Sequence, residues 1–106
     1  MDRPQIIIGT TPTVVIEIEG ESVDLSGVTE FLATIEQSSI VAVIEAQRVE
    51  VEGNYLSVSL RQEDTLRFRE GEATMQVNWK YPDGLRGAIE QMDIEFLPNS
   101  YRKVMT

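Results

Sequence analysis

The chain has 106 residues, with 18 acidic and 9 basic side chains, a formal net charge of −9, and neither cysteine nor histidine. Without those two residue types, thiol nucleophiles, disulfides, cysteine–histidine zinc sites and histidine-based triads are excluded. The acidic balance argues against nucleic acid or a membrane surface as a partner, because both are recognised through lysine and arginine. The length is typical of one domain, which we assign to residues 1–106.

The N-terminal region contains one apolar run, Ile6, Ile7 and Ile8, which is too short for the hydrophobic part of a signal peptide. No apolar segment reaches the length of a membrane span. These β-branched residues can pair within the chain's own sheet or add a strand to a partner's sheet. We favour the first, because exposed apolar edges are usually avoided, and we keep the three isoleucines as candidate interaction residues.

Two segments with a period of two predict strands that each have one apolar face. The apolar faces comprise Val14, Ile16 and Ile18 in residues 13–19, and Phe31, Ala33 and Ile35 in residues 28–37. Residues 40–46 are apolar almost throughout, which predicts a strand that is buried on both faces or packed at the centre of a sheet. A helix over residues 31–47 is the competing interpretation. The density of β-branched residues and the Ser38–Ser39 break favour strands.

Residues 48–60 are predicted to form a hairpin around the two-residue turn Gly53–Asn54. The register pairs Val51 with Leu56, Val49 with Val58, Glu50 with Ser57 and Gln47 with Leu60. Residues 61–71 have no strand periodicity, and we expect a short helical crossover that brings Leu66 into the core, with Phe68 as a further candidate. Asp64 or Ser59 is expected to cap it. The tail after Ser100 is expected to be poorly ordered.

Residues 72–96 are predicted to form a long hairpin that contains the single tryptophan. The turn at Tyr81–Gly84 has proline, aspartate and glycine at positions that suit them. The register places Tyr81 opposite Leu85, Trp79 opposite Gly87 and Val77 opposite Ile89. After Ile89 the apolar residues change parity, because Met92, Ile94 and Phe96 are in phase with one another. We therefore predict a β-bulge of one extra residue near Glu90–Gln91.

Together these segments predict an all-β fold, an antiparallel immunoglobulin-like β-sandwich of about seven strands with a short helical crossover near residues 61–68. A small barrel is the alternative.

Few side chains suggest chemistry. The pairs Glu17/Glu19 and Glu50/Glu52 lie two residues apart, the spacing of same-face carboxylates on a strand, which can bind Ca²⁺ or act in acid–base catalysis but are more often solvated. The serines have no base to activate them, and Trp79 is more often core than a ligand-stacking residue. We predict a protein that is not an enzyme, with no catalytic residue, no cofactor and no metal.

Two short strings carry a family resemblance. They are Gly9-Thr10-Thr11-Pro12-Thr13 and Leu60-x-Gln62-Glu63-Asp64-Thr65-Leu66-x-Phe68, followed by Gln76-Val77 and Asp83-Gly84. In this order they resemble small prophage-encoded proteins of Gram-positive bacteria. The resemblance implies a phage accessory of the tail or baseplate, similar to the immunoglobulin-like N-terminal domain of baseplate upper proteins, and it brings no catalytic residues.

From the residues and the resemblance we expect a non-enzymatic structural or assembly module that acts through protein–protein contacts. Its partner would be a second copy or another phage-derived protein. We expect it in the bacterial cytoplasm before assembly and then in the virion. The alternative is a carbohydrate- or ligand-binding β-sandwich, in which Tyr55, Tyr81 or Tyr101 stacks on the ligand.

Overall fold

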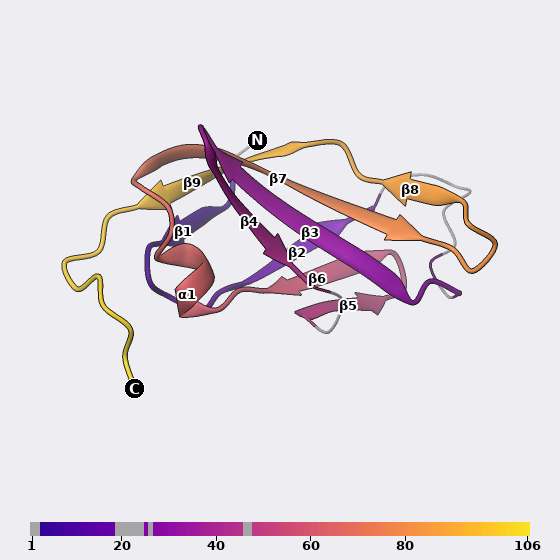
Figure 1. The fold of residues 1–106 in the computed structure, drawn as a ribbon, viewed down its shortest axis with the longest axis horizontal. Helices are drawn as coiled ribbons and strands as arrows, with labels where there is room; N and C mark the ends of the chain where they lie inside the picture. The colour runs from indigo at the N-terminus through magenta and orange to yellow at the C-terminus, as the bar shows by residue number, and fades with distance from the viewer. Residues whose placement is uncertain (1–2, 19–24, 26, 46–47) are drawn as a thin grey trace.

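The computed structural model describes residues 3–18, 25, 27–45 and 48–106 (Figure 1). The elements of this described part are β1 (Gln5–Ile7), β2 (Thr13–Glu17), β3 (Glu30–Gln37), β4 (Ile40–Ile44), β5 (Val49–Glu52), β6 (Tyr55–Ser59), α1 (Gln62–Thr65), β7 (Gly71–Lys80), β8 (Arg86–Ala88) and β9 (Met92–Leu97). Helix α1 and the C-terminal tail lie at one end of the molecule, and the turn between β7 and β8 lies at the other (Figure 1).

The strands form two sheets. The large sheet has the order β1-β9-β7-β3-β4, with β8 also paired to β7, and the small sheet has the order β2-β6-β5. The small sheet corresponds to strands B, E and D of an immunoglobulin fold, and the large sheet contains G, F and C with a C′ strand at its edge. The predicted immunoglobulin-like β-sandwich is therefore confirmed. The strands number nine in the described residues because β1 forms a separate strand and one long strand is split into β8 and β9.

The core lies between the two sheets, and alternation along the strands supplies it. The predicted inward residues of residues 13–19 and 28–37 are all buried. In β7 the buried residues are Ala73, Met75, Val77 and Trp79. The rings of Phe68 and Phe96 stack with centroids 4.7 Å apart, which closes the core beside the crossover.

The predicted register of the long hairpin is confirmed. Trp79 pairs with Gly87, and the Ile89 N–H donates to the Val77 carbonyl over 3.0 Å. Further along, Met75 pairs with Met92, so the residue numbers of partners sum to 166 at Trp79 and to 167 at Met75. One extra residue therefore lies between Ile89 and Met92, which is the predicted bulge.

Both predicted hairpin turns are also present. Gly84 has a φ of 94°, and the Tyr81 N–H donates to the Leu85 carbonyl over 2.8 Å. In the other hairpin, Val51 pairs with Leu56 and Val49 with Val58, as predicted. Gln47, which was expected opposite Leu60, lies outside the described residues.

Strand β4 differs from its prediction. It is the last strand of the large sheet and pairs only with β3 among the described residues. Ala42 and Ile44 are buried, but Val41 and Val43 are exposed. A strand buried on both faces needs a second layer on its outer side, and no described residue supplies one. The prediction of a doubly buried or central strand is therefore wrong.

The crossover forms the predicted helical turn, but the order of its core residues is reversed. Phe68 is fully buried, whereas Leu66 is only partly buried against the core. The reason is the length of α1: after this single turn the chain places Phe68, not Leu66, against Phe96.

Candidate interaction surface

The three N-terminal isoleucines are divided between the core and the surface. Strand β1 pairs in parallel with β9, so the run is part of its own sheet. Ile6 and Ile8 are buried in the core, and Ile7 has 45% of its surface exposed. Of the three candidate residues, only Ile7 presents its side chain to solvent.

The described residues do not form a cluster that could bind a metal ion. No group of three aspartate or glutamate side chains among them could hold a metal ion. Glu50 and Glu52 are exposed on β5 and face Ser57 and Tyr55, while Glu19 lies outside the described residues. None of the helices in the part of the chain that is described has the length and apolar character needed to cross a membrane.

The aromatic candidates do not form a common site. Trp79 is buried, and its indole packs so closely on Gly87 that a Cβ there would lie 2.4 Å from Nε1. Tyr55 and Tyr101 are exposed on β6 and in the tail, whereas Tyr81 packs partly against the core. The three tyrosines therefore come from separate segments.

Helix α1 is fixed to the turn between β1 and β2 through Thr65. This buried hydroxyl accepts a hydrogen bond from the Gly9 N–H over 2.9 Å and donates to the Thr10 carbonyl over 3.0 Å. The Leu60 N–H donates to the Pro12 carbonyl over 3.0 Å. These contacts join the two strings that carry the family resemblance, so both strings have a structural role in this fold.

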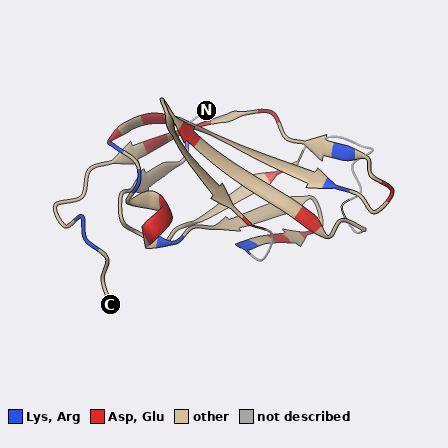
Figure 2. Cartoon of the chain, viewed as in Figure 1, with Lys and Arg blue, Asp and Glu red and all other residues tan. Residues whose placement is uncertain are grey.

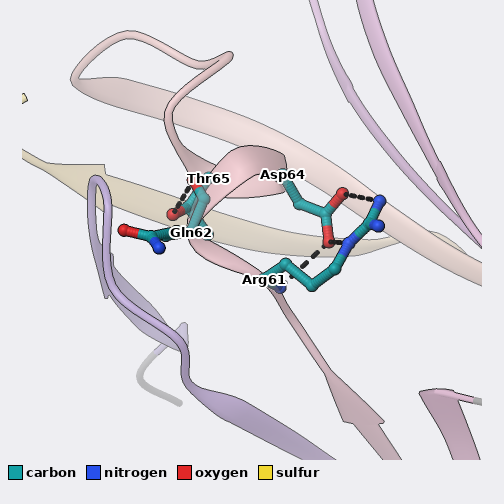
Figure 3. Close-up of polar contacts among 4 residues, drawn as sticks. All are labelled: Arg61, Gln62, Asp64 and Thr65. Atoms are coloured by element: carbon teal, nitrogen blue, oxygen red, sulfur yellow. Dashed lines mark hydrogen bonds and ion pairs between the residues drawn. The ribbon is translucent and has the colours of Figure 1, made fainter. Parts of the chain in front are cut away.

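Asp64 caps the start of the helix, as one of the two candidates predicted (Figure 3). Its carboxylate accepts a hydrogen bond from the Arg61 backbone N–H over 2.9 Å, and from the guanidinium over 3.1 and 3.3 Å. Only 3% of Asp64 is exposed. Burial raises the pKa of this carboxyl, but the hydrogen bonds and positive charge of Arg61 outweigh burial and hold the pKa below its ordinary value. The ion pair is thus part of a helix cap.

The C-terminal tail is attached to the same region rather than free. The Gln62 side chain donates to the Met105 carbonyl and accepts from the Met105 N–H, each over 2.8 Å. Arg102 donates to the Phe68 carbonyl over 2.9 Å. The expectation of a poorly ordered tail did not anticipate these contacts, because both partners belong to the crossover, far away in the sequence.

The outer face of the large sheet holds a cluster that the sequence did not single out. Leu32, Val41 and Val43 have exposed fractions of 43%, 41% and 48%. Val41 and Val43 lie two residues apart on one face of β4, and Leu32 lies diagonally across from Val43 because Thr34 pairs with Val43. We call these three residues the β3–β4 apolar patch. Its only signal in the sequence was the apolar run of residues 40–44, which contains more apolar residues than one buried face can use.

An open groove of about 350 Å³ adjoins this patch at Leu32. Its lining is mainly apolar, from Phe31, Leu32 and Trp79, and the polar residues around it from β3, β7 and β8 are Glu30, Asn78, Lys80 and Arg86. The Arg86 guanidinium donates to the Asn78 side-chain oxygen over 3.3 Å. Ligand sites usually enclose most of the ligand, and this groove is open, so the apolar patch is the stronger candidate surface.

Comparisons with known proteins support the fold alone. No protein-family model matches the chain, and no curated protein matches it. Among solved structures, the chain is similar to a putative glycoside hydrolase from Bacteroides vulgatus, with a TM-score of 0.52 and 9% sequence identity. The similarity covers 92% of this chain and 17% of that longer chain. At this identity the match reports a shared β-sandwich architecture.

Proposed function

We propose that this chain is a non-enzymatic structural or assembly module of a phage-derived particle, which acts through protein–protein contacts of the β3–β4 apolar patch. The observation that carries the proposal is the position of the patch. Its exposed side chains adjoin the edge of β4 with which no described strand pairs, so a partner could gain both apolar contacts and backbone hydrogen bonds.

The phage origin is supported by the resemblance alone, whose strings meet at Thr65 and Gly9. The polar side chains that meet at α1 cap the helix and tie it to a turn. This structural use of these side chains supports a non-enzymatic module.

The test is co-expression with the proteins encoded by the neighbouring genes, followed by purification through a tag on this chain. We expect a defined tail protein to co-purify with the wild type, and the double variant Val41→Lys/Val43→Lys to lose it. Val15→Lys is the matched control, because Val15 is also an exposed strand valine, with 58% exposure, on the small sheet. Retention of the partner by the double variant would contradict the proposed surface. Absence of this chain from purified particles, measured by mass spectrometry, would contradict the proposed role.

Binding of a carbohydrate or another small ligand is the second candidate, and the groove beside Arg86 is the observation that favours it. A glycan array tests it directly. Binding that is lost on Arg86→Ala would support the groove, and no binding to bacterial wall glycans would remove this candidate.

A further inference from the structure

Five strands of the two sheets have a side that no described strand pairs with, and they differ in how this edge is protected. Proteins protect edges with short strands, prolines or charged residues. Strand β1 has three residues and follows Pro4, β2 follows Pro12 and ends in Glu17, β5 carries Glu50 and Glu52, and β8 has three residues and carries Arg86. Strand β4 has none of these features, and Figure 2 shows it without a charged residue along its length. It is the unprotected edge among the described strands.

The sequence of β4 is also palindromic. It reads Ile-Val-Ala-Val-Ile from Ile40 to Ile44. Two copies that pair antiparallel about Ala42 therefore place Ile40 opposite Ile44 and Val41 opposite Val43, twice, by symmetry. Residues that face each other across an antiparallel pair share one face of the sheet. The exposed valines then meet on the outer face, and the inward residues meet on the core side.

The backbone of β4 suits the same register. In an antiparallel ladder, residues alternate between pairs that exchange two hydrogen bonds and pairs that exchange none. Gln37 and Ile40 close the two-residue turn, so Ile40, Ala42 and Ile44 are expected to bond to β3. The peptide groups of Val41 and Val43 then face the open edge, where pairing about Ala42 lets each Val41 exchange two hydrogen bonds with Val43 of the second copy.

Charge favours self-association at this edge over the edges of β2 and β5, which carry glutamates. Each copy has a net charge of −9, so two copies approach most easily along an uncharged strand. In the register about Ala42, Glu45 lies opposite Ser39 of the second copy. Glu36 pairs with Val41 of its own copy, and beyond Val41 the next residues across the joined sheet are Val43 and then Thr34 of the second copy. No acidic residue of one copy directly faces an acidic residue of the other.

We infer that β4 pairs with β4 of a second copy about Ala42, which joins the two large sheets into one continuous sheet. The inference deepens the proposed function, on which it rests, by identifying the partner at this edge. An interface of one strand from each copy is small against the roughly 1,200 Å² of stable interfaces. The dimer is therefore weak, and its population should rise over an accessible range of protein concentration.

Sedimentation equilibrium or light scattering over a wide concentration range tests the inference. We expect a monomer–dimer equilibrium for the wild type and for Val15→Lys. Val41→Lys/Val43→Lys and Val41→Glu/Val43→Glu should each be monomeric, because like charges then face each other across the pair. An equimolar mixture of the two double variants should recover a dimer, since each lysine meets a glutamate. A wild type that is monomeric at every concentration, or a dimer that persists in both double variants, overturns the inference.

The register has its own test, because the chain has no cysteine. Ala42 faces itself across the symmetry axis in a non-hydrogen-bonded pair, whose Cα atoms lie about 4.5 Å apart, within disulfide range. Ala42→Cys should therefore crosslink under mild oxidation. Val41→Cys should not crosslink, because position 41 faces position 43 of the second copy and the two cysteines at position 41 lie diagonally across from each other. Crosslinking of Val41→Cys without Ala42→Cys overturns the register.

The two proposals fail separately. A monomeric wild type that still binds a tail protein through Val41 and Val43 removes the self-pairing and leaves the proposed function. A dimer that follows the charge-swap pattern, but whose chain is absent from purified particles, leaves the pairing and removes the assembly role.

Discussion

The contact between Trp79 and Gly87 gives the sharpest stability prediction. Gly87 does not have a left-handed φ, so its backbone accepts alanine. An added Cβ would lie 2.4, 2.6 and 2.9 Å from Nε1, Cε2 and Cζ2 of the indole. Ordinary contacts between such atoms are about 3.5–4.0 Å. Gly87→Ala therefore forces the rigid ring or strand β8 to move by roughly 1 Å, as overpacking of a close contact does.

Overpacking of this kind typically costs about 1–3 kcal/mol. The gain from replacing glycine, through a less flexible unfolded chain, is about 0.4–1 kcal/mol and opposes it. We expect a net loss of about 1–2 kcal/mol for Gly87→Ala, or roughly 4–8 °C in Tm for a domain of this size. Gly27→Ala is the control, because nothing lies within 4 Å of a Cβ at Gly27, and it should be neutral or slightly stabilising.

Urea denaturation followed by circular dichroism gives these free energies, and the fluorescence of the single tryptophan reports the ring's environment. The decisive measurement is a double-mutant cycle with Trp79→Leu. In that background the loss caused by Gly87→Ala should disappear, because leucine leaves room for the methyl group. An equal loss in both backgrounds would refute the steric reasoning.

Two further predictions concern the crossover. Asp64→Asn should cost about 1–2 kcal/mol at pH 7, because a neutral amide replaces the carboxylate that accepts hydrogen bonds from the Arg61 backbone N–H and guanidinium. The pKa of Asp64 in the folded protein lies below its value in the unfolded chain, which is near 3.9. The stabilisation by the carboxylate is therefore full above about pH 5 and is lost as the pH falls through the folded pKa. The urea midpoints of wild type and variant should then converge in acid, and a constant difference would contradict the cap. Thr65→Val should cost about 1–3 kcal/mol in thermal unfolding, because the partly buried Gly9 N–H loses its partner. Thr13→Val on the exposed face of β2 removes only a 3.5 Å contact with the Ser59 hydroxyl, which water can replace, and should be near neutral; equal effects would argue against the Thr65 contact.

The parts of the fold that could be predicted are those in which local signals agree. The turn at Tyr81–Gly84 set a register, and that register placed Trp79 against Gly87 and required the bulge before Met92. Turn chemistry and hydrophobic alternation act over a few residues, so a single sequence contains both signals.

The predictions that failed concern features that depend on contacts between distant parts of the chain. An apolar run such as Ile40–Ile44 is compatible with a central strand or with an edge that uses its outer face for contacts, and only the order of the strands decides. In the same way, the position of Phe68 depends on where a single helical turn ends, and the attachment of Met105 depends on a partner 43 residues away. Hence the candidate surface became visible only in the structure.

The residues that carry the resemblance and the residues of the proposed binding surface lie in different parts of the chain. The strings that resemble prophage proteins meet at Gly9 and Thr65, where they hold α1 against the first turn, and the β3–β4 apolar patch lies outside both strings. A chain can therefore keep the strings and the buried residues Ala42 and Ile44, and with them the sandwich, while the exposed Val41 and Val43 change. In the proposed function, the strings support the origin of the chain, whereas Leu32, Val41 and Val43 would select its partner. Variants at the patch should alter association without lowering stability by more than about 0.5 kcal/mol, the range of ordinary surface substitutions.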